Sequence, residues 1–108
     1  MANNFKSNLS SSIGTTAISV YTTPTNTTTT VIGLTLCNTS TVQISCDVYI
    51  TRSSVNYYLG KGLQIPVGTS IVPIGGEQKV VLQAGDIIKV ISNNATSCDV
   101  VISVLELS

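Results

Sequence analysis

Residues 42–51 read VQISCDVYIT, and apolar side chains occupy every second position of this stretch. Successive side chains of a β-strand point to opposite faces, so a period of two is typical of a strand with one face in a core. The apolar face is expected to pack inside the domain, while the polar face meets water or a partner. The stretch therefore predicts β structure in the middle of the chain.

Strand signals of the same kind extend in both directions from this stretch. Val, Ile and Thr dominate them, and turn residues such as those at 66–68 and 83–86 separate them. The expected strands cover residues 15–22, 28–38, 42–51, 55–59 continuing at 63–65, 69–74, 79–82, 87–91 and 98–105. No window shows a helical period. The sequence predicts an all-β fold, an antiparallel β-sandwich of about eight strands with jelly-roll or immunoglobulin-like connections.

The chain is predicted to divide at residue 12. Its 108 residues suffice for one domain with its own core. Residues 1–12 are rich in Asn and Ser with little periodicity, which predicts an N-terminal arm that is flexible alone or ordered by a partner. The arm has one lysine and no apolar run, so no secretory signal peptide is expected. Residues 13–108 are predicted to form the sandwich.

The chain carries very little charge. Charged residues make up 9%, hydrophobic residues 43%, and the formal net charge is zero. This composition argues against disorder, and the absence of a basic stripe argues against nucleic-acid binding. The apolar runs are far shorter than the roughly 20 residues of a membrane-spanning helix, so no membrane partner is expected. Low charge predicts a surface covered by other subunits, as in a homo-oligomer, with a monomer solubilised by Ser, Thr and Asn as the alternative.

The sequence offers little for catalysis. It has no histidine, which excludes Ser-His-Asp and Cys-His arrangements, and its few carboxylates are scattered. Asp86 follows Gly85 in a turn, where a carboxylate is expected to accept backbone N–H groups. Cys37, Cys46 and Cys98 lack metal-ligand spacing and are expected to be free, buried and apolar in character. The chain is therefore predicted to be non-enzymatic, without a cofactor or metal.

Five residues are candidates for partner contact. Phe5 is an apolar residue in the polar arm, with packing onto its own domain as the alternative. Val101 and Leu105 lie on the outward side of the last predicted strand. Tyr57 and Tyr58 form the one aromatic cluster, and a carbohydrate-binding adhesion module centred on either tyrosine is an alternative function. Adjacent strand residues point to opposite faces, so at most one tyrosine belongs to such a platform.

Several short stretches between residues 21 and 105 carry a family resemblance. They are YTTP (21–24), VIGLTLCNTS (31–40), VYI (48–50), IPVGTS (65–70), KVVLQAGD (79–86) and VVISVL (100–105). In their order and spacing, the chain resembles small structural proteins of tailed bacteriophages, particularly those of marine and cyanobacterial hosts. The resemblance covers about four-fifths of the chain and contains no catalytic or ligand residues.

The resemblance implies a virion protein that is assembled in the host cytoplasm. Its expected role is that of a capsid decoration or fibre-base subunit, which acts through protein–protein packing. A neck or tail accessory protein (stopper, terminator or baseplate component) is the alternative. The implied partners are copies of the chain itself and other virion proteins, such as the major capsid or tail proteins.

Overall fold

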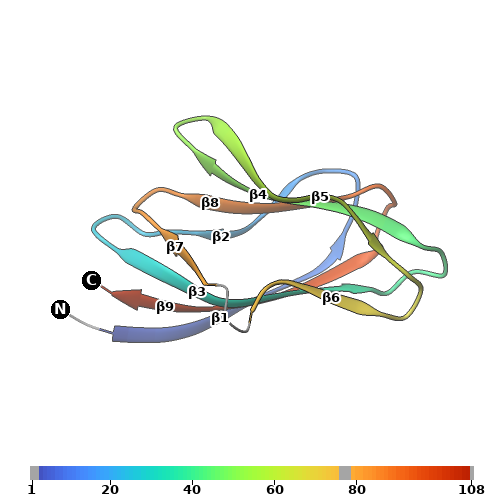
Figure 1. Cartoon of the computed structure of the whole chain (residues 1–108), viewed down its shortest axis with the longest axis horizontal. Helices are drawn as coiled ribbons and strands as arrows, with labels where there is room; N and C mark the ends of the chain where they lie inside the picture. The colour runs from blue at the N-terminus through green and yellow to red at the C-terminus, as the bar shows by residue number, and fades with distance from the viewer. Residues whose placement is uncertain (1–2, 76–78, 108) are drawn as a thin grey trace.

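The computed structural model describes residues 3–75 and 79–107 and shows two antiparallel sheets packed face to face (Figure 1). The strands are β1 (Asn3–Ile13), β2 (Ile18–Thr22), β3 (Thr28–Asn38), β4 (Ile44–Arg52), β5 (Val55–Ile65), β6 (Ser70–Ile74), β7 (Val80–Leu82), β8 (Ile87–Ser92) and β9 (Cys98–Leu107). The described residues contain no helix, and hence none that is long and apolar enough to cross a membrane. The predicted all-β sandwich is confirmed.

The strand order decides between the two predicted connection patterns. One sheet has the order β1-β9-β3-β6, with β7 also paired to β3, and the other has the order β2-β8-β4-β5. With β7 set aside, the first strand pairs with the last, β2 with β8, β3 with β6, and β4 with β5. This is the pairing of a long hairpin rolled into a sandwich, which defines the jelly roll. The immunoglobulin-like alternative is therefore wrong.

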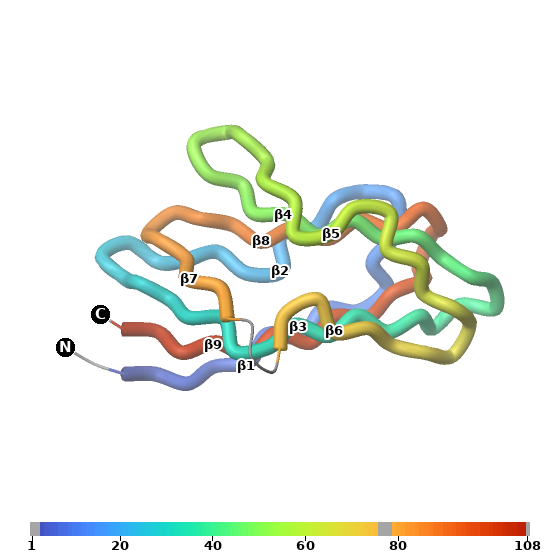
Figure 2. The backbone as a smooth tube through the Cα atoms, in the orientation of Figure 1, coloured from blue at the N-terminus to red at the C-terminus, as the bar shows by residue number. Residues whose placement is uncertain are grey.

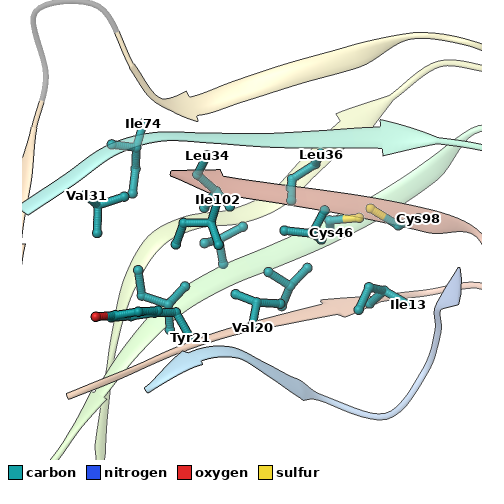
Figure 3. Packing of buried hydrophobic residues seen from close by; sticks show 14 of the residues in the cluster. Ile13, Val20, Tyr21, Val31, Leu34, Leu36, Cys46, Ile74, Cys98 and Ile102 are labelled. Carbon is teal, nitrogen blue, oxygen red and sulfur yellow. The ribbon is translucent and has the colours of Figure 1, made fainter. Parts of the chain in front are cut away.

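The core lies between the two sheets, and the alternating stretch at 42–51 contributes to it as predicted. Ile44, Cys46 and Val48 of β4 are at most 1% exposed. They belong to one buried cluster with side chains of the opposite sheet, including Leu34 and Ile102, which Figure 3 shows near Cys46. Burying each such side chain stabilises the fold by roughly 1.5–3 kcal/mol, so the alternation of β4 accounts directly for its position in the sandwich.

The segment predicted as an arm forms strand β1 instead. It pairs with β9 from Asn3, opposite Leu107, to Ser10, opposite Val100, and residues 1–2 lie outside the described part. The predicted domain boundary at residue 12 therefore falls inside this strand. An edge strand is held by backbone hydrogen bonds on one side and needs no buried side-chain row, so its polar sequence gave no strand signal. The ordering of this segment by a partner stays a prediction.

A buried carboxylate connects the two sheets. Glu106 of β9 accepts a hydrogen bond from the Tyr21 hydroxyl of β2 at 2.5 Å, and Lys6 Nζ of β1 lies 2.9 Å from its other oxygen. The Tyr21 hydroxyl also lies 2.8 Å from Thr29 Oγ1. The hydrogen bonds from Tyr21 and Lys6 hold the pKa of Glu106 below its usual range. Burial and the hydrogen bond to Glu106 raise the pKa of Tyr21 to about 12.

A second buried carboxylate fixes the turn before β8. Asp86 accepts the backbone N–H of Gln83 at 2.8 Å, which confirms the predicted turn role of this carboxylate. It also accepts two hydrogen bonds from the guanidinium of Arg52, at 2.8 and 2.5 Å. These contacts, with the Arg52 hydrogen bond as the largest cause, lower the pKa of Asp86. The turn is thereby tied to the end of β4.

Stability is expected to fall at both ends of the pH range. Asp86 and Glu106 have lowered folded pKa values, so their contribution is complete above their unfolded values of roughly 4 and is lost as pH falls through the folded values. Tyr21 has a raised pKa, so its contribution is complete below about pH 10 and is lost as pH rises toward 12. Urea unfolding midpoints from pH 2 to 12 measure this dependence. A midpoint that stays constant below pH 4 would contradict the assignment.

Candidate interface on the outer face of the five-stranded sheet

One row of outward side chains crosses four strands of the larger sheet. Phe5 of β1 lies opposite Leu105 of β9. Leu105 lies opposite Thr30 of β3 on its other side, and Thr30 lies opposite Val81 of β7. Residues directly opposite one another in an antiparallel pair point to the same face, so these side chains form a continuous row.

A second row runs parallel to the first. Leu9 of β1 lies opposite Val101 of β9, and Val101 lies opposite Thr35 of β3. Two shallow depressions of about 320 and 360 Å³ lie on this face, one bordered by Leu9 and Val101 and the other by Phe5. The two rows together are called the outer patch. Its residues are Phe5, Leu9, Thr30, Thr35, Val81, Val101 and Leu105.

The residues of the outer patch are mainly apolar and carry no charge, and four of them are open to solvent in the single chain. Phe5 is 75% exposed, Leu9 73%, Val81 54% and Val101 45%. One charged residue, Asp99 of β9, borders the depression beside Leu9 and Val101, and its carboxylate accepts a hydrogen bond from the Ser12 backbone N–H at 3.1 Å. Lys6 turns to the inner side of β1, where it pairs with Glu106. Contiguous exposed apolar surface of this kind is typical of protein–protein contact sites.

The local sequence explains why β1 and β9 present this face. Within β9, Val100, Ile102 and Val104 are buried, so the alternate residues Val101 and Leu105 must point outward. A strand with apolar residues on both faces is typical of a sheet that is packed on both sides. The sequence of β9 therefore predicts a packing partner on its outer face, which the single chain does not supply.

The structure separates the five predicted contact residues into two groups. Phe5, Val101 and Leu105 lie together in the outer patch, whereas Tyr57 and Tyr58 lie on β5 of the other sheet. Sequence reasoning missed Leu9 and Val81. Leu9 stands four residues after Phe5, which places both on one face of a strand, but this signal is useful only once residues 3–13 are known to form one.

Tyr57 and Tyr58 do not form a common platform. The ring of Tyr58 packs against that of Tyr49, with centroids 5.1 Å apart, and Lys61 Nζ lies 4.7 Å from the Tyr58 centroid. Tyr57 pairs with Ile50 and borders a different depression, of about 280 Å³, on the β4–β5 hairpin. This hairpin projects beyond the rest of the sandwich (Figure 2). The predicted opposite orientation of the two rings agrees with these separate neighbours.

Among the described residues, no group of three or more His, Cys, Asp or Glu side chains is placed to hold a metal ion. The outer patch consists of five apolar side chains and two threonines, and it can contribute shape complementarity and burial of apolar surface to an interface.

Comparison with known proteins identifies the fold and no family. No protein-family model and no curated protein matches the chain. A solved structure of a protein from Bacillus endospore appendages, described as a novel family of disulfide-linked pili, superposes with a TM-score of 0.60 at 10% identity, covering 99% of this chain and 87% of that one. A chain of the T13 particle of infectious bursal disease virus superposes with a TM-score of 0.51 at 9% identity. The present chain covers 96% of its own length there but only 35% of the viral chain. At such identities the likeness establishes a shared β-sandwich architecture.

Proposed function

We propose that this chain is a non-enzymatic structural subunit that assembles by packing its outer patch against a second copy. The observation that carries the proposal is the set of uncharged apolar rows on β1 and β9, with Phe5 and Leu9 each about three-quarters exposed. Burying such surface stabilises an interface by roughly 25 cal/mol per Å² before the cost of association.

A second copy is the best-suited occupant because the outer patch is neutral. In a two-fold contact each side chain meets the same surface of its partner, so a charged patch would place like charges together. An uncharged patch has no such repulsion. The low total charge of the chain, with five acidic and five basic residues, also leaves little net repulsion between copies.

We further propose that the assembly is a tailed-phage virion, with the chain as a capsid decoration or fibre-base subunit. The sequence resemblance at residues 21–105 supports this assignment. The two structural neighbours, from a pilus and from a viral particle by their descriptions, are compatible with it. A neck or tail accessory role is the alternative, and copy number separates the two. We expect hundreds of copies per virion for decoration, against about six to twelve for a neck ring.

Two measurements test the proposal. Sedimentation velocity of the purified chain at micromolar concentration is expected to show a defined oligomer. Quantitative mass spectrometry of virions from a phage that encodes the chain is expected to detect it and give its copy number. A monodisperse monomer that is absent from those particles would overturn both levels of the proposal.

The carbohydrate-binding alternative has less support. Tyr58 already contacts Tyr49 and Lys61, which leaves less of its ring for stacking on a sugar. Loss of glycan-array binding in a Tyr58→Ala variant would favour this alternative. We expect no binding by the unmodified chain at millimolar glycan concentration.

A further inference from the structure

Two cysteine side chains meet inside the core from opposite sheets. Cys46 lies on β4 of the four-stranded sheet and Cys98 on β9 of the five-stranded sheet. Both are 0% exposed. Figure 3 shows their sulfur atoms directed toward each other, and the Cys98 thiol donates a hydrogen bond to the Asp99 carbonyl oxygen at 3.6 Å.

The third cysteine has a different position. Cys37 of β3 is only partly buried and lies opposite Asp99 and Ser70, at the outward side of its strand. Its neighbours in the strand, Leu36 and Asn38, are the buried ones. The odd cysteine count of the sequence thus resolves into an internal pair and one thiol near the surface.

The contacts of the pair make its two thiols unequal. The hydrogen bond from Cys98 lowers the pKa of the Cys46 thiol, and a contact with Ser92 acts in the same direction. The same hydrogen bond and burial raise the pKa of Cys98. These shifts belong to the closed sandwich, so they do not set the order in which the two thiols react while the chain folds.

We propose that Cys46 and Cys98 form a disulfide bond between the two sheets when the chain folds in the presence of a low-molecular-weight disulfide. The thiolate of one cysteine attacks one sulfur of the reagent and releases its other half as a thiol. The thiolate of the second cysteine then attacks the sulfur of the first and displaces the remaining half. Two protein thiols are oxidised and one reagent disulfide is reduced to two thiols, so protons and electrons balance.

The sealed position of the pair determines when the bond forms. Neither sulfur is reachable in the closed sandwich, so exchange takes place while the sheets are still coming together. Because the sulfurs already face each other, side-chain rotation and an approach of β4 and β9 would bring them to the geometry of a disulfide. The bond closes a loop of about 50 residues, and a loop of that length strongly restricts the unfolded chain.

Refolding in a glutathione redox buffer tests this inference independently of the proposed assembly. The full chain is refolded, denatured, alkylated with N-ethylmaleimide and weighed by mass spectrometry. We expect one adduct per chain, located on Cys37 by peptide mapping, and a linked peptide pair containing Cys46 and Cys98. A chain with three adducts, or a bond to Cys37, would overturn the proposal.

Matched variants sharpen the result. Cys37→Ser is expected to leave no adduct, whereas Cys46→Ser is expected to leave two. The thermal midpoint of the oxidised chain should exceed that of the reduced chain by on the order of 10 °C, and this difference should persist in Cys37→Ser. If Cys46→Ser fails to fold, the adduct count and midpoints of the unmodified chain and of Cys37→Ser decide the question. Equal midpoints in both redox states would contradict the proposed bond.

Discussion

Replacing Phe5 and Val101 together with lysine is expected to weaken self-association by at least about 100-fold. Each residue occupies one row of the outer patch, and loss of a central interface anchor typically costs about 2 kcal/mol or more. The two added lysines of each copy would also lie near those of the partner, and their like charges would repel. Sedimentation velocity over a concentration series measures the change. Because both side chains are exposed, the free energy of unfolding should change by no more than about 1 kcal/mol.

Val55→Lys combined with Val42→Lys is the matched control for this experiment, because it adds the same two charges at exposed valines outside the outer patch. Val55 is 49% exposed, against 45% for Val101, and it lies at the start of β5 in the other sheet. We expect this variant to associate as the unmodified chain does. Equal loss of association in the control and in the patch variant would show that added charge, rather than the outer patch, governs assembly.

Replacing Glu106 with alanine is expected to lower the free energy of unfolding by about 2–4 kcal/mol. The substitution removes a carboxylate that is 5% exposed and that binds both Tyr21 and Lys6. Among the described residues, the buried Tyr21 hydroxyl then keeps Thr29 as its hydrogen-bond partner, and hydrogen bonds to charged groups contribute more than those between neutral groups. Urea denaturation at pH 7 measures the loss.

Tyr21→Phe and the double variant test whether this loss comes from the contact itself. The single change Tyr21→Phe should cost about 1–2 kcal/mol, because Glu106 keeps Lys6 but loses its buried donor. The double variant should lose less free energy of unfolding than the sum of the two single losses, by at least about 0.5 kcal/mol. Strict additivity would mean that the two residues stabilise the fold separately.

The sequence predicted the strands whose side chains alternate between core and solvent. All eight expected strands are present. The stretch around Cys46 forms β4, as its period of two predicted. Strand β1 was not predicted. Within it, the core residue is Ile13 at its end. Backbone hydrogen bonds of an edge strand leave no pattern in the side chains, so this element could not be found by periodicity.

Connections and the candidate interface were less predictable. The order of strands depends on long-range pairing, for which alternation carries no information, and so the jelly roll was one of two expectations. Val101 and Leu105 were predictable as outward residues because their neighbours in β9 are more regularly apolar. Their proximity to Phe5 follows only from the β1–β9 register, which no local pattern specifies.

The neutrality of the outer patch also bears on the speed of assembly. Charged interfaces accelerate encounter through long-range attraction, and dissolved salt screens that attraction. A patch without charges has no such steering, so copies should meet at the unassisted rate of roughly 10⁵–10⁶ M⁻¹ s⁻¹. That rate should be nearly the same at low and at high ionic strength, which would make the local concentration of the chain the main control on when copies associate.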